Sequence, residues 1–259
     1  MSAATAPLPR MLVAHTRAVV LNTLRQPAFS VTTIALPIIF FAFFGLSHAH
    51  DHFARTSVSV GAYLMASFGA YGVSSAMVFN FGMGVALARG QKTDLLQRAT
   101  PLPASVAVAA TVLNAFVFAA LSLLCLSAFV FLAGGVRLEP LTWLQLVLRL
   151  LLGAVPLIGL GMAIGYGVSP SAASAVTNVI YLPMAFASGL FVPVDQLPDF
   201  VQRVAPYLPT YHYGQLAWNA IGAPTEAVSL AVLNLAVWTV ILFALALRAF
   251  RLEQSRKFA

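Results

Sequence analysis

The chain has 259 residues, of which 60% are hydrophobic and only 8% are charged. A soluble domain of this length carries about 25% charged residues, so the composition excludes a soluble globular protein and indicates an integral membrane protein. The formal net charge is +7, but the basic residues flank apolar runs. We therefore expect them to set the orientation in the membrane, not to bind nucleic acid.

The first segment, residues 9–26, is predicted to be an amphipathic helix that lies in the membrane plane. Its apolar residues share one arc beside a group of arginines, namely Leu12, Val13, Val19, Val20 and Leu24, with Arg10, Arg17 and Arg25. A signal peptide is the alternative interpretation. The apolar run that follows is longer than the roughly 7–15 residues typical of a signal peptide, which favours a first membrane span.

Six apolar runs follow, and each contains the roughly 20 residues that a membrane-spanning helix requires. They cover residues 28–46, 58–88, 104–133, 141–168, 172–191 and 228–250. We therefore expect an all-α polytopic membrane protein, with six transmembrane helices in one domain over residues 1–259. Six spans place both termini on the same side of the membrane. With both ends inside, ten Lys and Arg residues lie on the inner side and four on the outer side, which predicts cytoplasmic termini in a plasma (inner) membrane.

Two of these spans carry small residues at four-residue intervals, which is typical of helices that pack closely in membranes. The residues are Ala62, Ala66, Ala70 and Ser74 in the second span, and Gly161 and Gly165 in the fourth. Pro37, Pro156 and Pro183 are each expected to kink or interrupt a span, because proline lacks the N–H donor of a regular helix.

Residues 193–222 lie between the fifth and sixth spans. Each apolar piece of this stretch is too short to cross about 30 Å of hydrocarbon. Leu197, Phe200, Val201 and Val204 recur at helical spacing, which predicts a short helix with one apolar face. Several tyrosines and Trp218 follow, residues that favour the membrane–water boundary. We expect a pair of short interfacial or re-entrant helices on the outer face, with an ordinary loop as the alternative.

The spans contain no Asp or Glu near their centres, whereas carriers driven by protons or sodium usually keep ionisable groups there. The phosphate-binding pattern GxxxxGK[ST] is also absent, so the chain is not expected to bind ATP itself. If the protein moves a substrate uphill, a partner must supply the energy.

Two other classes of function stay open at this point. His48, His50 and His52, with Asp51, could hold zinc or copper in a membrane-embedded, metal-dependent enzyme, although their spacing matches no strong metal motif. A polar loop is the plainer interpretation of these residues. A non-transporting membrane scaffold would also have the same spans.

Two motifs resemble the permease subunits of type-2 ABC exporters. One is the inner segment Thr93-Asp94-Leu95-Leu96-Gln97-Arg98-Ala99-Thr100-Pro101-Leu102, and the other is Ser188-Gly189 through Pro193, followed by Leu197-Pro198 and Ala205-Pro206 through Thr210. The resemblance covers nearly the whole chain. It implies a permease that forms a homodimer in membrane lipid and docks on a separate ABC ATPase subunit, which binds the ATP and Mg.

Two groups of functional residues are expected, the first from the resemblance and the second from the position of the short outer helices. The ATPase contact would be made by a cytoplasmic helix that includes Thr93, Asp94, Leu95, Leu96, Arg98, Thr100 and Pro101. On the outer face, we expect the stretch after the fifth span to form a gate. Its residues would be Gly189, Pro193, Leu197, Phe200, Val201, Val204 and Tyr211. No catalytic residue and no metal ligand is expected in the chain itself.

Overall fold

The computed structural model describes residues 7–51, 58–91, 102–223 and 225–257, and the regular elements within these ranges are helices. Four of them are long and apolar enough to cross a membrane, namely Val60–Gly90, Ser105–Gly134, Pro140–Gly167 and Val228–Ser255. Thr33–Phe44 and Ala173–Ala187 are shorter apolar helices. The all-helical prediction is confirmed for the described residues, while the number of six spans stays a prediction.

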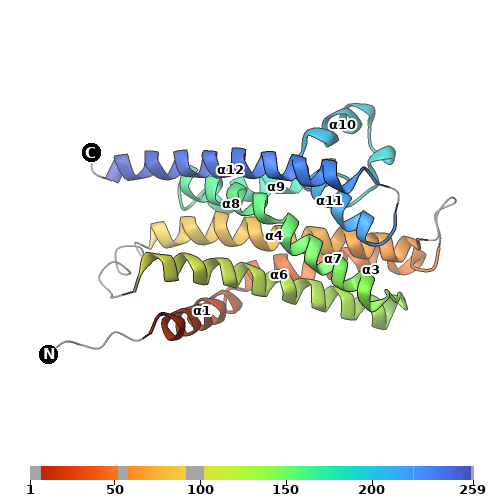
Figure 1. Cartoon of the computed structure of the whole chain (residues 1–259), viewed down its shortest axis with the longest axis horizontal. Coiled ribbons are helices and arrows are strands. Elements are labelled where there is room, and N and C mark those ends of the chain that lie inside the picture. Colours follow the sequence, from red (N-terminus) through yellow and green to blue (C-terminus); the bar gives the residue numbers. More distant parts are fainter. Residues whose placement is uncertain (1–6, 52–57, 92–101, 224, 258–259) are drawn as a thin grey trace.

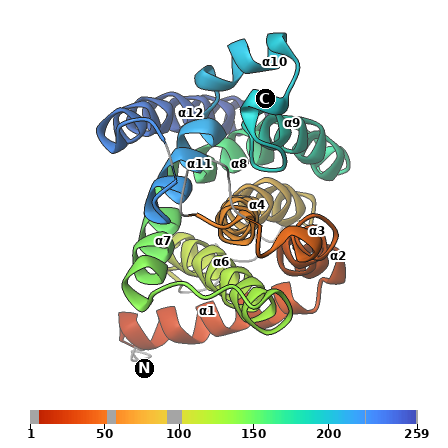
Figure 2. The same ribbon diagram turned by 90° about the vertical axis from the view of Figure 1, so that its right-hand side faces the viewer.

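The bundle is organised around α4 (Val60–Gly90), most of whose side chains are buried. In Figure 2 this helix lies in the middle of the molecule, and it packs against α6 (Ala104–Gly134), α8 (Val155–Gly167) and α9 (Ala173–Ala187). The small-residue stripe predicted for this span faces the neighbouring helices, because Ala66, Ala70 and Ser74 are completely buried. Small side chains on the central helix thus let several helices approach it at once.

The helices α4 and α8 approach each other closely, and two glycines of α8 permit the contact. A Cβ atom added to Gly161 would lie 2.7 Å from the carbonyl oxygen of Val78, and one added to Gly165 would lie 2.6 Å from that of Phe81. Both distances are too short for any side chain, so the packing predicted from these glycines is confirmed. On its other side, α8 packs along α12 (Val228–Lys257).

Prolines break two of the predicted spans. The fourth consists of α7 (Pro140–Gly153) and α8, which meet at Ala154, two residues before Pro156. The first consists of α2 (Pro27–Ser30), a π-helical turn, η1 (Val31–Ala35), and α3 (Leu36–Phe44), in which Pro37 is buried. The wider turn lies directly before Pro37, where the missing N–H and the bulky ring prevent a regular α-helical turn.

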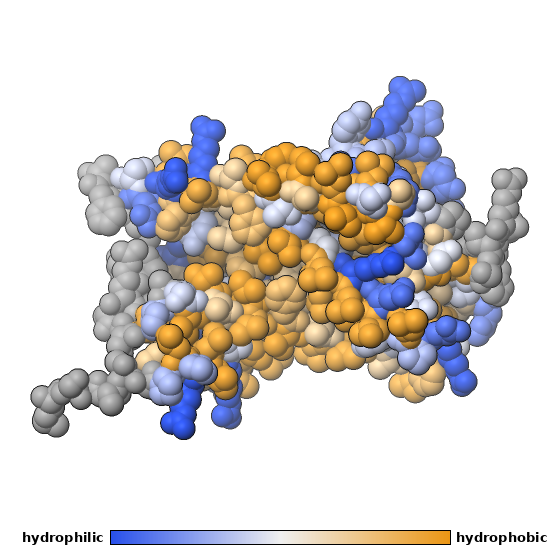
Figure 3. All heavy atoms as spheres, in the orientation of Figure 1, coloured by the Kyte–Doolittle hydropathy of each residue, from blue (hydrophilic) through white to orange (hydrophobic). Residues whose placement is uncertain are grey.

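The two ends of the bundle differ (Figure 1). One, the α1 end, contains α1 (Leu8–Leu24) and the C-terminal part of α12; Figure 2 shows α1 lying across the bundle, where it packs on α6. The other, the cap end, carries α10 (Asp199–Val204) and α11 (Pro209–Ala220). On the face in Figure 3, apolar side chains fill the middle and hydrophilic ones gather toward the ends. The helix predicted at residues 9–26 is confirmed as a helix; its place in the membrane stays a prediction.

Candidate functional site

The cap is the segment from the end of α9 through α11, and it begins where α9 ends at Ala187. The 15 residues of α9 span about 22 Å at 1.5 Å per residue, which is less than the roughly 30 Å of a hydrocarbon core. The chain then turns back inside the protein, since Ser188, Gly189 and Leu190 are buried. Gly189 has a φ of +85°, and a Cβ there would lie 2.6 Å from Cγ2 of Val194, so the turn requires glycine. Pro193 follows directly, before the 3-10 turn η3 (Val194–Gln196).

The second cap helix, α11, is inserted into the bundle. Most of its residues are buried, and it packs against α4, α7, α9 and α12. Three hydrogen bonds join it to other helices: the Tyr213 hydroxyl donates to the Leu150 carbonyl (3.0 Å), Trp218 Nε1 to Ser67 Oγ (2.7 Å), and Arg149 Nη1 to Asn219 Oδ1 (2.5 Å). This helix is therefore part of the packed bundle, while the interfacial or re-entrant placement expected for residues 193–222 stays a prediction.

Further polar contacts hold the start of α11. Thr210 bonds to the Ser188 hydroxyl and donates to the Met184 carbonyl at 3.2 Å, which ties the start of α11 to the end of α9. Burial, together with a hydrogen bond and the negative charge of Glu226, raises the pKa of Tyr211 to about 12. Its hydroxyl therefore stays protonated at neutral pH, and the contact with Glu226 joins α11 to the segment before α12.

By contrast, α10 lies outside the bundle (Figure 1). Leu197 and Val201 are half-buried, but Phe200 is 70% exposed and Val204 is 49% exposed. A short helix was predicted in this stretch and is present as α10, whereas the outer gate predicted for its apolar residues stays a prediction. Helical spacing placed them near one another, but the body of the protein covers only one side of the short helix, and the other side stays open.

At the α1 end, the side chain of Arg89 joins three long helices. From the last turn of α4, its Nε donates to Oε1 of Glu253 on α12 at 2.6 Å, and its Nη1 donates to the carbonyl oxygens of Gly165 (2.5 Å) and Val168 (3.0 Å) at the end of α8. Both charged side chains are largely buried, with 17% and 12% exposure. We call this arrangement the Arg89 clamp.

The Arg89 clamp lies three residues before the segment predicted to contact an ATPase. That segment, with Thr93, Asp94, Leu95, Leu96, Arg98, Thr100 and Pro101, lies outside the described residues. Sequence reasoning counted Arg89 and Glu253 only as flanking charges. The two residues of the pair lie 164 positions apart in the chain. The sequence indicated only that each carries a charge at the edge of an apolar run.

The histidines predicted as possible metal ligands are placed only in part. His48 and His50 are exposed, and Nδ1 of His48 lies 3.0 Å from the hydroxyl of Ser47. His52 lies outside the described residues. Among the residues that the structure does describe, no three His, Cys, Asp or Glu side chains are grouped as a metal site would require.

One further feature concerns polar side chains on the outside of α9. Asn178 and Ser174 are both exposed, one turn apart, and the Asn178 amide donates to the Ser174 carbonyl at 2.9 Å. Val179 beside them is 72% exposed. An otherwise apolar helix thus presents amide and hydroxyl groups on a surface that no other described element covers.

Comparison with known proteins agrees with this architecture. The family model described as ABC-2 type transporter matches residues 11–221, which is most of the chain. The chain is also 28% identical over 210 residues to the putative transport permease YvfS of Bacillus subtilis (strain 168), an alignment that covers 79% of this chain and 83% of that protein. A bundle of apolar helices, matched along most of the chain by one family, identifies this protein as a membrane permease that belongs to the ABC-2 type transporter family.

Proposed function

We propose that this chain is the membrane-spanning subunit of an ATP-driven exporter, in which two copies enclose the substrate route and a separate ABC ATPase supplies the energy. The ATPase subunit would bind ATP and Mg, because this sequence contains no phosphate-binding GxxxxGK[ST] loop. Family membership supports the general assignment. The coupling, the dimer and the outward direction are the proposal.

The Arg89 clamp is the observation that carries the coupling. A push on residues 93–101 would act on α4, which ends at Gly90, and on α6, which begins at Ala104. At the end of α4, Arg89 is bonded to α8 and α12, and Gly161 and Gly165 allow α8 to pack directly on the α4 backbone. The three helices therefore move together when the partner ATPase displaces the segment that contains Leu95, Leu96 and Arg98.

The exposed polar face of α9 supports the dimer. Polar side chains in membrane helices usually face other helices or a water-filled cavity, since lipid cannot satisfy their hydrogen bonds. Asn178 and Ser174 instead lie on the outside of a single copy. A second copy packed on this face would cover them, or would place them along the route between the two copies.

The distribution of basic residues supports the orientation of the chain in the membrane, and hence the outward direction of transport. Both ends of the chain, with most of its Lys and Arg residues, belong to the α1 end, which we assign to the cytoplasm and the ATPase. The cap then lies on the outer face and acts as a gate. Within it, α11 is fixed in the bundle while α10 is free on one side, so α10 and the turn at Gly189 are the elements that open.

The coupling is tested by the double variant Leu95→Asp with Leu96→Asp, in the permease co-expressed with its ATPase. We expect permease-stimulated ATP hydrolysis to be lost while the protein still inserts, because two charges replace the apolar tip of the contact. Gln97→Asp is the matched control, since it adds one charge between the leucines and Arg98 without removing either. Stimulation that stays unchanged in the double variant contradicts the assignment.

The gate is tested by deleting residues 197–204. In a chain that still folds and dimerises, the deletion should abolish export of the substrate into the medium or into inverted vesicles. Export at the level of the intact chain would remove α10 from the gating mechanism.

A further inference from the structure

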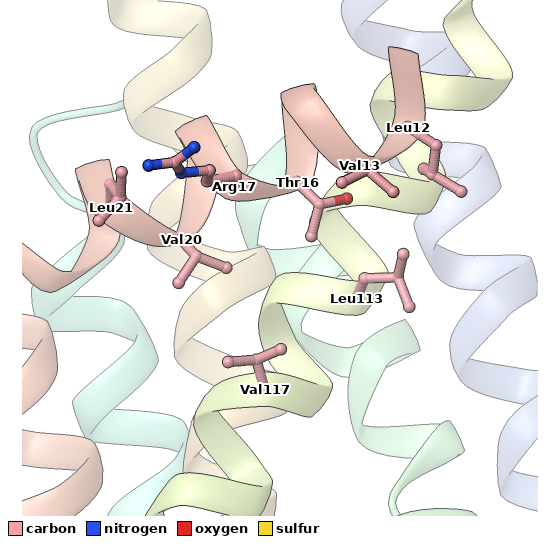
Figure 4. Close-up of a pocket in the computed structure, with 8 residues that line it drawn as sticks. All are labelled: Leu12, Val13, Thr16, Arg17, Val20, Leu21, Leu113 and Val117. Carbon is pink, nitrogen blue, oxygen red and sulfur yellow. The ribbon is translucent and has the colours of Figure 1, made fainter. Parts of the chain in front are cut away.

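An open groove of about 390 Å³ lies between α1 and α6. In Figure 4, Leu12, Thr16 and Val20 of α1 point toward Leu113 and Val117 of α6. Val13, Arg17 and Leu21 complete the lining. The walls are therefore almost entirely aliphatic, and α1 has no buried residue of its own. Apolar surface of this kind is stable only if something apolar covers it.

The same groove has a positive rim. Arg17 extends beside α1 toward Leu21 and away from α6 (Figure 4), and it is exposed. Arg10 and Arg25 lie on the same helix, and the sequence has no Asp or Glu before Asp51. The basic charge along α1 is therefore not neutralised within its own segment, and an anionic group at the rim is favoured.

The groove also contains a hydrogen-bonding atom with no partner. The hydroxyl oxygen of Thr16 is buried and makes no hydrogen bond within the described residues. A buried hydroxyl without a partner costs about 1–3 kcal/mol, so a ligand with an acceptor oxygen near this position gains from it. The groove thus offers an aliphatic trough, one hydroxyl donor and a guanidinium at its edge.

We propose that this groove binds an anionic phospholipid, with one acyl chain between α1 and α6 and the phosphate group near Arg17. The aliphatic walls fit a hydrocarbon chain, the Thr16 hydroxyl fits an ester or phosphate oxygen, and Arg17 fits the negative charge. A peptide segment fits poorly, because its backbone N–H and C=O groups would find only one partner in this trough. The lipid would fasten α1 to α6, which the hydrogen bond from Asn114 to Thr23 (3.2 Å) joins at one point.

The binding is tested on the purified full chain by native mass spectrometry, with phosphatidylglycerol and phosphatidylcholine of the same acyl chains added in equal amounts. The intact protein should retain phosphatidylglycerol about fivefold more than phosphatidylcholine, which corresponds to one arginine near an anionic surface. Val117→Trp fills the trough and should remove the retained lipid. Leu124→Trp, on an exposed site of α6 outside the groove, should retain it.

The role of the Arg17 charge in lipid preference is tested separately. Arg17→Gln should reduce the preference for phosphatidylglycerol to near onefold, whereas Arg10→Gln, on the same helix but outside the lining, should leave most of it. Equal retention of the two lipids by the intact protein would overturn the proposal. So would lipid retention that Val117→Trp does not change, or loss of a dimer in Val117→Trp with no loss of lipid, which would assign the groove to a second copy.

Discussion

The cap end and the α1 end of the bundle are held together in different ways. At the cap end, α11 is buried and its hydrogen bonds are spread over α7, α9 and α4 through Tyr213, Thr210 and Trp218. At the α1 end, the hydrogen bonds and the ion pair described among α4, α8 and α12 centre on the side chain of Arg89. Distributed contacts favour a fixed scaffold, and contacts that depend on one residue favour an element that can be released or moved as a unit.

The largest expected effect lies at the cap end. Trp218→Ala should lower the free energy of unfolding by about 3–5 kcal/mol, because it removes a buried indole and the hydrogen bond to Ser67. The indole also stacks on Tyr63 at 5.4 Å and lies against Gly189 and Gly214, so the cavity would open under the turn of the cap. Thermal unfolding of the purified protein measures the loss.

Trp218→Phe is the comparison variant, since it keeps an aromatic ring while it loses the N–H and part of the indole volume. A smaller loss of stability than in Trp218→Ala is expected for that variant. If Trp218→Ala were as stable as the intact chain, α11 would not be the fixed scaffold described above.

At the α1 end, we expect a smaller loss of stability than at the cap end, together with a larger loss of function. Arg89→Gln should cost about 1–2 kcal/mol, since the pair with Glu253 is mostly but not fully buried. Stimulation of the partner ATPase should fall far more than stability, because α8 and α12 would no longer follow α4. Thermal unfolding and ATP hydrolysis, measured on the same preparation, separate the two effects.

Adding Glu253→Gln to Arg89→Gln also removes the negative charge that the guanidinium neutralised, so stability should partly return while stimulation stays low. Recovery of stimulation together with stability would show that the Arg89 clamp is only structural, and would remove the proposed difference between the two ends.

The smallest effect is expected on α10. Phe200→Ser should change the free energy of unfolding by less than about 0.5 kcal/mol, because the ring is 70% exposed. Val201→Ser, on the half-buried side of the same helix, is the comparison and should cost more. Equal costs for the two variants, again from thermal unfolding, would mean that α10 does not have the open side that the structure gives it.

Local patterns predicted much of this fold. Proline chemistry predicted the break near Pro156, and the spacing of Gly161 and Gly165 predicted a close helix contact, because both depend on a few neighbouring residues. The amphipathic pattern of residues 9–26 predicted α1 within two residues at each end. These features follow from backbone geometry, which is a local property of the sequence.

Features set by tertiary packing could not be predicted in the same way. Helical spacing grouped Leu197, Phe200, Val201 and Val204, but which side of α10 is covered depends on where the bundle lies. The partner of Arg89 lies 164 positions away, so no local pattern reveals it. The stretch 193–222 predicted a pair of short helices, but the start of α11 at Pro209 depends on a tertiary contact, because Thr210 bonds back to the end of α9.

The most direct test of the account is whether α4 and α12 keep their spacing at the α1 end when the ATPase works. In a Cys125→Ser background, which removes the only cysteine, spin labels at Leu87 and Leu252 would report this distance; both side chains are exposed. We predict one distance distribution, unchanged when ATP is added to the permease–ATPase complex, and a broadened one in the Arg89→Gln variant. A distance that shifts with ATP in the chain with Arg89 intact would contradict the claim that α4, α8 and α12 move as one unit.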